Sequence, residues 1–222
     1  MTATQTGATI VDRLIPAPLE GQIGKAGHDL VLVGAGAVLI AISAMFSVAL
    51  PDNPVPITGQ TFGVLLAAGA LGGRRGTAAA AVYVLVGVMG LPAFAEGRGG
   101  LGMIASIDDG HLLLGATGGY LVGFVLASAL VGLLAQRGWD RRLPAAMAAM
   151  VLGNVVIYLV GLPWLQAATG LPFEETIAKG LVPFIVGDTL KILLAGATLP
   201  AATWLVGRNR RTDLGSSDGR GG

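Results

Sequence analysis

Hydrophobic positions in this chain are grouped into long apolar runs instead of the alternating or one-sided patterns of soluble proteins. The first run, residues 30–50, has about twenty residues, enough at about 1.5 Å per residue to cross a hydrocarbon core of about 30 Å. Further apolar runs occupy residues 62–71, 77–91, 118–135, 145–160 and 181–206. The pattern predicts an all-α integral membrane protein built as a six-transmembrane-helix bundle.

Composition indicates the same class. Hydrophobic residues make up 53% of the chain and charged residues 12%, against roughly 25% charged in soluble proteins. The chain has no cysteine, which excludes disulfides and thiolate metal sites. Its two histidines, His28 and His111, lie far apart in sequence, and no basic stretch is interleaved with aromatic residues. We therefore expect no metal, no cofactor and no nucleic-acid partner.

The ends of the chain differ from its middle. Residues 1–27 are polar, contain Pro16 and Pro18, and show no apolar core followed by a cleavage site, so we expect a disordered tail instead of a signal peptide. Residues 208–222 are basic and then rich in Gly and Ser, which predicts a second disordered tail. The membrane domain is thus predicted to span residues 28–207.

Charges are segregated between the loops. A six-span topology places eleven of the fourteen Lys and Arg residues on one side, and leaves Arg98 and Lys179 on the other beside six acidic residues. By the positive-inside rule, both termini are then cytoplasmic. The external loops are the long ones, rich in Pro, Gly and aromatic residues.

Asp188 and Lys191 are full charges inside the last apolar run. Their spacing of three places both on one face of a helix, and a charge at the centre of a span costs about 2.5 to 3.5 kcal/mol. Either the two residues only satisfy each other, or they form the floor of a small-molecule pocket about 12 Å below the outer end. No Walker-type loop or Ser/His/Asp arrangement is present, so we expect no enzyme. An intramembrane enzyme that uses the pair as acid and base is the alternative.

Three other segments carry alternatives. Pro51–Thr61, with three prolines, is either a connecting loop or a lid or cavity wall. Leu91–Tyr120 is the longest interruption between runs, and its apolar residues predict a re-entrant or capping segment. Small residues at positions 34, 37, 41 and 44 predict close helix packing, either within the bundle or against another subunit.

Four segments together resemble one family: VPITGQTFGVLLAAGALGGRRG, VYVLVGVMGLPAFAEGRGGLG, GATGGYLVGF and LVPFIVGDTLK. In order and spacing they are similar to the BioY family, the biotin-specific S components of energy-coupling factor (ECF) transporters. The resemblance covers about residues 30–206. The chain departs from the family pattern at Ala116, where proline is expected, and in the insert IASIDDG.

The resemblance implies a multi-pass subunit of the bacterial plasma membrane that captures biotin from the external side for uptake into the cytoplasm. Its partners would be a transmembrane coupling subunit and two ATPase subunits, which alone use ATP. Asp188 would accept from the ureido N–H groups of biotin, and Lys191 would steady that aspartate or bind another oxygen of the ligand. A stand-alone biotin carrier and an S component for another vitamin are the alternatives.

Further residue roles follow from the same resemblance. The implied biotin contacts are Asp188, Lys191, Tyr120, Phe94, Tyr83, Asn154, Gln60 and Thr58. Tyr158 and Trp164 are further candidates for the lining. Ala37 and Ala41 would contact the coupling subunit. Asn154 is an amide inside an apolar run and must hydrogen-bond some partner.

Overall fold

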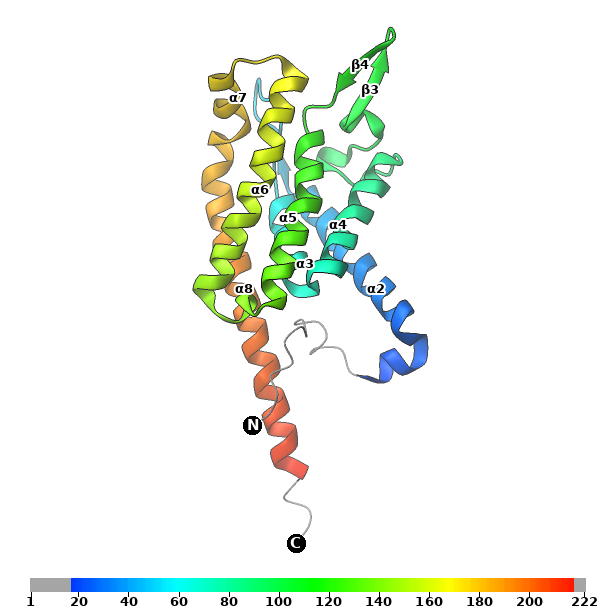
Figure 1. The fold of residues 1–222 in the computed structure, drawn as a ribbon, viewed down its shortest axis with the longest axis vertical. Coiled ribbons are helices and arrows are strands. Elements are labelled where there is room, and N and C mark those ends of the chain that lie inside the picture. The colour runs from blue at the N-terminus through cyan, green and yellow to red at the C-terminus, as the bar shows by residue number, and fades with distance from the viewer. Residues whose placement is uncertain (1–16, 218–222) are drawn as a thin grey trace.

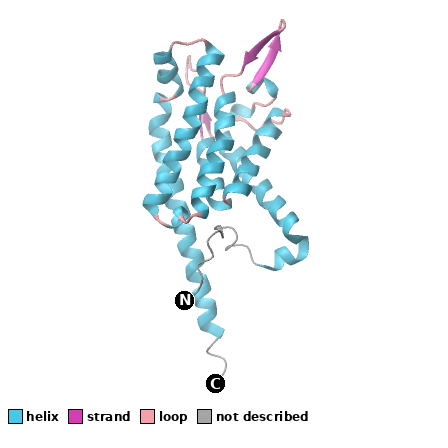
Figure 2. Ribbon diagram, viewed as in Figure 1, coloured by secondary structure: helices cyan, strands magenta, loops and turns pink. Residues whose placement is uncertain are grey.

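The computed structural model describes residues 17–217, with side chains from Gly24 to Ala202 and at Trp204. The described chain is mostly helical, and its long helices run side by side along one axis (Figure 1). The only strands in residues 17–217 are four short ones, and all of them lie toward the upper part of Figure 2. The start of α2 and the end of α8 lie at the opposite end.

Four helical stretches are long and apolar enough to cross a membrane: Gly24–Met45, Gly118–Gln136, Leu143–Thr169 and Phe173–Ala202. They correspond to most of α2 (Ala17–Met45), to α5 (Gly118–Gln136), to α6 (Leu143–Thr169), and to α7 (Phe173–Gly180) with the first part of α8 (Val182–Ser217). Two shorter helices, α3 (Gln60–Leu71) and α4 (Gly73–Val88), lie between α2 and α5 in sequence. The prediction of a helical membrane protein is confirmed, as is the short helix after the first loop.

Helix α6 is longer than predicted, because it continues through Pro163 to Thr169. Proline alone would predict a break here. Just beyond it, the indole Nε1 of Trp164 donates to the carbonyl of Gly115 at 3.0 Å. A Cβ atom at Gly119 of α5 would fall within 3 Å of the same Trp164 side chain. This close packing holds the last turns of α6 against α5, so the helix persists in a stretch that the sequence assigned to a loop.

Two hairpins form at one end of the bundle. β1 (Ser47–Val48) pairs antiparallel with β2 (Ile57–Thr58), which folds the first outer loop back on itself. β3 (Ala105–Asp108) and β4 (His111–Leu114) form the second hairpin. Its tip residues, Asp109 and Gly110, have φ values of 48° and 78°, as in two-residue hairpin turns. Figure 1 shows this hairpin projecting away from the helices, so a re-entrant form is wrong for this part of the long loop.

The rest of the long loop lies against the bundle. It contains two short 3-10 turns, Ala95–Gly97 and Leu101–Met103. Phe94 and Ala95 are buried there, and a Cβ atom at Gly87 of α4 would run into the ring of Phe94. The capping role expected for this segment is therefore found in its first part, which α4 positions through a glycine that leaves room for the ring.

Helix α5 lies at the centre of the fold and contacts α3, α4 and α6. Small residues allow this close approach. A Cβ atom at Gly123 would lie 2.9 Å from the Cα atom of Ile157 in α6. A Cβ atom at Gly132 would lie 2.5 Å from the backbone carbon of Gly72 in the turn between α3 and α4. The glycine-rich fourth run is thus the packing centre of the bundle.

The two segments expected to be disordered are described in part. From Ala17 onward the first one is helical, with a kink at Gly24 where φ is 70°. In the second, α8 stays helical to Ser217. Residues 1–16 and 218–222 lie outside the described residues, so disorder there stays a prediction.

The small-residue stripe of α2 lies at the edge of the core. Ala44 is completely buried and Ala37 is 9% exposed, whereas Gly34 and Ala41 are half-buried. The neighbouring Val38 and Ile42 are exposed. Own-bundle packing therefore accounts for Ala44 and most of Ala37, whereas Gly34 and Ala41 are the parts of the stripe that another subunit could reach.

Candidate ligand-binding site

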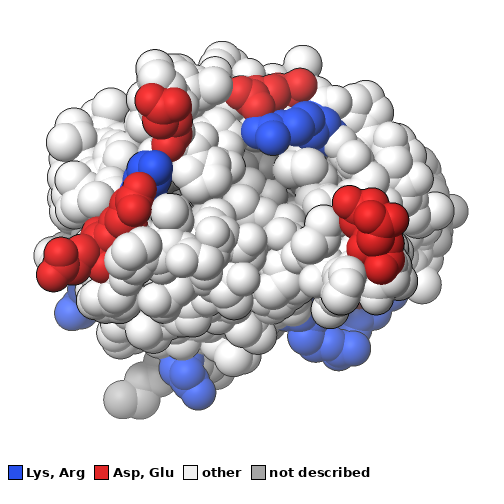
Figure 3. Space-filling model, turned by 90° about the horizontal axis from the view of Figure 1, so that it is seen from above, with Lys and Arg blue, Asp and Glu red and all other residues white. Residues whose placement is uncertain are grey.

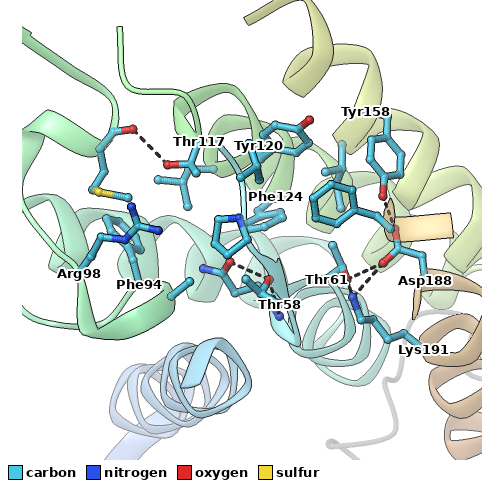
Figure 4. A pocket seen from close by; sticks show the side chains of 18 residues that line it. Thr58, Thr61, Phe94, Arg98, Thr117, Tyr120, Phe124, Tyr158, Asp188 and Lys191 are labelled. Carbon is cyan, nitrogen blue, oxygen red and sulfur yellow. Dashed lines mark hydrogen bonds and ion pairs between the residues drawn. The ribbon is translucent and has the colours of Figure 1, made fainter. Parts of the chain in front are cut away.

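A pocket of about 600 Å³, counting space open to solvent, lies near the end of the bundle that carries the hairpins. Charged side chains lie at its two ends, and aromatic and aliphatic side chains, together with Thr58, line the space between them (Figure 4). The lining residues are Val55, Pro56, Thr58, Gln60, Thr61, Phe94, Ala95, Arg98, Met103, Thr117, Tyr120, Leu121, Phe124, Ile157, Tyr158, Phe184, Asp188 and Lys191. The first two outer loops contribute, together with α3, α5, α6 and α8.

Asp188 and Lys191 meet on one face of α8, as their spacing predicted, and both lie at one end of this pocket. Lys191 Nζ donates to Asp188 Oδ1 at 2.9 Å. Thr61 Oγ1 donates to the same oxygen at 3.3 Å, and the hydroxyl of Tyr158 donates to Oδ2. Lys191 Nζ also donates to Thr61 Oγ1 at 3.2 Å. The aspartate is thus held by donors from three different helices.

This network explains how a carboxylate is kept in an apolar interior. The Asp188 side chain is 6% exposed and that of Lys191 is 16% exposed. An unpaired charge at such a site would be costly, so its stability depends on charge-assisted hydrogen bonds. A carboxylate has about four acceptor positions and an ammonium has three N–H donors. Three acceptor positions and two donors are in use, which leaves capacity at both groups for a ligand.

Arg98 lies at the opposite end of the pocket. Figure 4 shows its guanidinium across the cavity from Asp188, and it forms an ion pair with Glu96. In the sequence, Arg98 is recognisable only as a positive charge on the predicted external side. Its position in AEGRGGLG, within a segment that carries the family resemblance, was the signal that could have identified it.

The charges on the end face of the bundle around the pocket agree with the predicted external position of Arg98. Figure 3 looks onto this end and shows acidic side chains around its rim. Lys179 is ion-paired with Glu175 at 2.9 Å, as Arg98 is with Glu96. Of the cations predicted to face outward, Arg98 is the one that also lines the pocket.

Thr58 and Gln60 line the wall near the first outer loop. Thr58 Oγ1 donates to Gln60 Oε1 at 3.0 Å, and Gln60 Nε2 donates to the hydroxyl of Tyr83. Tyr83 is 1% exposed and is absent from the lining. Its ring packs edge-on against Phe94, with ring centroids 5.6 Å apart. Of these expected contacts, Thr58, Gln60 and Phe94 face the pocket, and Tyr83 supports two of them from behind.

Tyr120 and Tyr158 form the wall on the side of α5 and α6. Their rings meet edge-to-face with centroids 6.3 Å apart. The Tyr120 hydroxyl donates to the carbonyl of Gly180 at 2.9 Å, which fixes the ring beside the end of α7. Trp164 is absent from the lining, and its role in the structure is to join α6 to α5.

Asn154 lies one helical turn from Tyr158 but does not line the pocket. It is 6% exposed, and its Oδ1 atom is buried without a hydrogen-bond partner in the described part of the chain. The partner that its burial requires is thus not among the side chains of the pocket. A direct role for Asn154 in ligand binding stays a prediction.

The arrangement fits binding of a small polar-ended molecule. Donors and acceptors stand at two separated ends, with aromatic and aliphatic side chains between them, as is typical of ligand sites. Among the described side chains, residues 24–202 and Trp204, no group of three His, Asp or Glu could hold a metal ion.

Comparisons with known proteins point to one family. The model of the BioY family matches residues 21–208. A biotin transporter BioY of Rhizobium etli is 35% identical over 176 residues, 76% of this chain and 89% of the relative. A protein of the same name from Thermotoga maritima is 38% identical over 168 residues, 76% of this chain and 91% of the relative.

A solved structure has the same fold. The crystal structure of the S-component for biotin from an ECF-type ABC transporter superimposes with a TM-score of 0.69 at 22% identity. The match covers 84% of this chain and 93% of the solved one.

Proposed function

This chain belongs to the BioY family, and from that premise we propose that it is the biotin-binding S component of an ECF-type importer in the bacterial plasma membrane. It captures biotin at the external face for uptake into the cytoplasm. A transmembrane coupling subunit and two ATPase subunits supply the energy, so ATP is used by the partners. The observation that carries the proposal is the buried Asp188–Lys191 network at one end of a pocket whose other end holds Arg98.

The ends of the pocket match the ends of biotin. Biotin carries two ureido N–H donors and one ureido carbonyl at one end, and a carboxylate at the end of an apolar chain. The spare acceptor capacity of Asp188 suits an N–H group, and the third N–H of Lys191 suits the carbonyl oxygen. Arg98 is suited to the carboxylate, since guanidinium and carboxylate form paired hydrogen bonds. The tyrosine and phenylalanine side chains enclose the middle of the molecule.

The proposed topology has six crossings with both termini in the cytoplasm. Four helical stretches meet the length and composition of a span, and α3 and α4 supply the other two crossings. Helix α3 has only 12 residues, about 18 Å of helix, and is extended outward by the segment 55–61. That segment lines the pocket, so its irregular backbone faces a cavity and protein instead of lipid. The pocket then lies on the external side, where the acidic loops are.

Docking on the coupling subunit is proposed to use the exposed edge of α2. Ala41 is half-buried, and the bulkier Val38 and Ile42 beside it are exposed. Small residues between larger ones permit another helix to approach closely. Ala37 contributes only its outer edge, because most of it is covered by the bundle.

The test of the proposed function is calorimetry of the purified protein with biotin. Asp188→Asn keeps the shape of the side chain but replaces an acceptor with an amide and leaves Lys191 without its counter-charge. The lost contact is the hydrogen bond from the ureido N–H to a charged acceptor, which contributes about 1.5 to 3 kcal/mol, so biotin affinity should fall about 10- to 150-fold. Tyr158→Phe, which removes one donor and no charge, should cost about 1 kcal/mol, about fivefold.

Controls separate loss of binding from loss of fold. Glu174→Gln changes an exposed acid of α7 outside the pocket and should bind biotin as the native protein does. Each variant is compared by thermal unfolding in the same detergent. A folded Asp188→Asn protein with unchanged biotin affinity would remove the aspartate from the site. Binding of a different vitamin in place of biotin by the native protein would overturn the proposed function itself.

A further inference from the structure

A second groove lies between α4 and α5, away from the biotin pocket. It encloses about 780 Å³, counting space open to its surroundings, and its lining includes Arg74, Ala78, Ala81, Ala129 and Leu133. Both helices run side by side in Figure 1, and the groove exists because three of these side chains are alanine. Thr77 also lines the groove, with its hydroxyl donating to the carbonyl of Gly73 at 2.6 Å. The remaining lining side chains, apart from Arg74, are apolar.

The arginine lies at the level where α5 ends. A Cβ atom at Gly73, the residue before Arg74, would lie 3.1 Å from Leu133 Cδ2 and 3.2 Å from Gln136 Oε1. Gln136 is the last residue of α5, a helix that is long and apolar enough to span a membrane. Arg74 is therefore at the height of the lipid headgroups. Ala81 is seven residues further along α4, about 10 Å into the hydrocarbon layer.

Arg74 and its neighbour Arg75 differ in their pairing. Arg75 forms an ion pair with Asp29 at 2.6 Å. Arg74 is exposed and has no ion pair or hydrogen bond to any other residue of the described part of the chain. The groove thus ends at a guanidinium that lacks an anion, and its walls continue from there into the apolar layer.

We propose that this groove binds one anionic phospholipid, with the phosphate against Arg74 and an acyl chain along Ala78, Ala81 and Ala129. Guanidinium groups match phosphate oxygens in geometry and charge, and basic pockets between helices at a membrane edge are typical of headgroup sites. A soluble phosphate would leave the apolar walls uncovered. The site depends on the chain being embedded in a membrane and does not depend on which vitamin the other pocket binds.

The test is native mass spectrometry of the purified full chain with added phosphatidylglycerol or phosphatidylcholine of identical acyl chains. The native protein should retain phosphatidylglycerol in preference. Arg74→Gln should lower its retention about tenfold, the loss expected for one charge-assisted contact. Ala81→Phe, which fills the groove and keeps the charge, should lower it as well. Arg141→Gln removes another exposed arginine, close in sequence to the end of α5 but outside the groove, and should retain the lipid.

Several outcomes would overturn the proposal. Equal retention of the two lipids by the native protein would show annular lipid only, and an equal loss in Arg141→Gln would show a diffuse charge effect. Displacement of the lipid by glycerol phosphate alone would indicate a site for soluble anions. Loss of the coupling subunit from Arg74→Gln and Ala81→Phe, with lipid retention unchanged, would make the groove a protein contact. Biotin titrations of the same variants should be unchanged, which keeps this test separate from that of the biotin pocket.

Discussion

Replacing Arg98 by glutamine should weaken biotin binding and should also remove the preference of the protein for biotin over biotinamide. Arg98 lines the pocket across from Asp188 (Figure 4). If the ureido ring binds at Asp188, the carboxylate at the far end of the ligand reaches the arginine. Biotinamide keeps the ring and the chain but lacks the charge that Arg98 would recognise.

The expected magnitude follows from the exposure of the arginine. Hydrogen bonds to charged groups contribute about 1.5 to 3 kcal/mol when they are well protected. The Arg98 side chain is 43% exposed and is shared with Glu96, which is 34% exposed, so solvent and the existing partner reduce the gain. A loss of about 1 to 1.5 kcal/mol is expected, which corresponds to about a five- to tenfold weaker affinity.

The assay is calorimetry of the native protein and Arg98→Gln, each with biotin and with biotinamide. The substitution of Arg98 and the replacement of the biotin carboxylate by an amide remove the same contact, so their effects on affinity should not add. Arg98→Gln should therefore bind both ligands almost equally. Glu96→Gln is the matched control. It leaves the guanidinium free of its acidic partner and should keep or strengthen biotin binding. Additive losses, or an equal loss for both ligands in Arg98→Gln, would refute a contact between Arg98 and the carboxylate.

Two further pairs of substitutions test the packing behind the site and the partner surface. A Cβ atom at Gly161 would lie 2.6 Å from the Tyr120 ring, so Gly161→Ala should destabilise the protein by about 1 to 3 kcal/mol and weaken biotin binding; Gly34→Ala, which meets open space, should do neither in the same melting and binding assays. Ala41→Trp should leave biotin binding intact but prevent co-purification with the coupling subunit and ATP-dependent uptake. Ala37→Trp should also lower the yield of folded protein, because Ala37 is 9% exposed, and an intact complex of the Ala41 variant would contradict the proposed surface.

The Asp188–Lys191 pair could be identified as a candidate pocket floor from the sequence because charged residues inside an apolar run are energetically costly and easily seen. Two charges in one apolar run, three residues apart, require partners wherever the helix lies. The hydroxyls that complete the network, from Thr61 and Tyr158, come from other helices. Their roles depend on how α3 and α6 face α8, and that packing has no signature in the spacing of the residues themselves.

Arg98 lines the pocket but was not predicted to do so, whereas Tyr83 was predicted at the ligand but lies behind the lining. Arg98 lies in an irregular loop without helical or strand periodicity, so its direction is set by the short turns around it and by the burial of Phe94. Tyr83 was expected at the ligand because it is an aromatic residue with a hydroxyl inside an apolar run. Its hydroxyl accepts from Gln60 instead, one layer behind the wall, and a single sequence does not distinguish these two layers.

The length of α6 illustrates how tertiary packing overrides a local signal. Pro163 predicts a helix end nearby, and the predicted helical run ended at residue 160. The helix nevertheless continues because Trp164 fits against Gly118 and Gly119 of α5, where any side chain would collide with the indole. The glycines were visible in the sequence as part of GATGGY, but their partner on another helix was not.

The Asp188 carboxylate connects ligand binding to the arrangement of the helices. It accepts hydrogen bonds from Thr61 on α3, Tyr158 on α6 and Lys191 on α8. A ligand N–H that binds the same carboxylate stabilises only the arrangement in which these helices meet. By linkage, a movement that separates α8 from α3 or α6 must weaken ligand binding by the free energy with which the ligand stabilises this arrangement. A partner that shifts one of these helices could therefore release the ligand without entering the pocket, since the pocket floor itself would come apart.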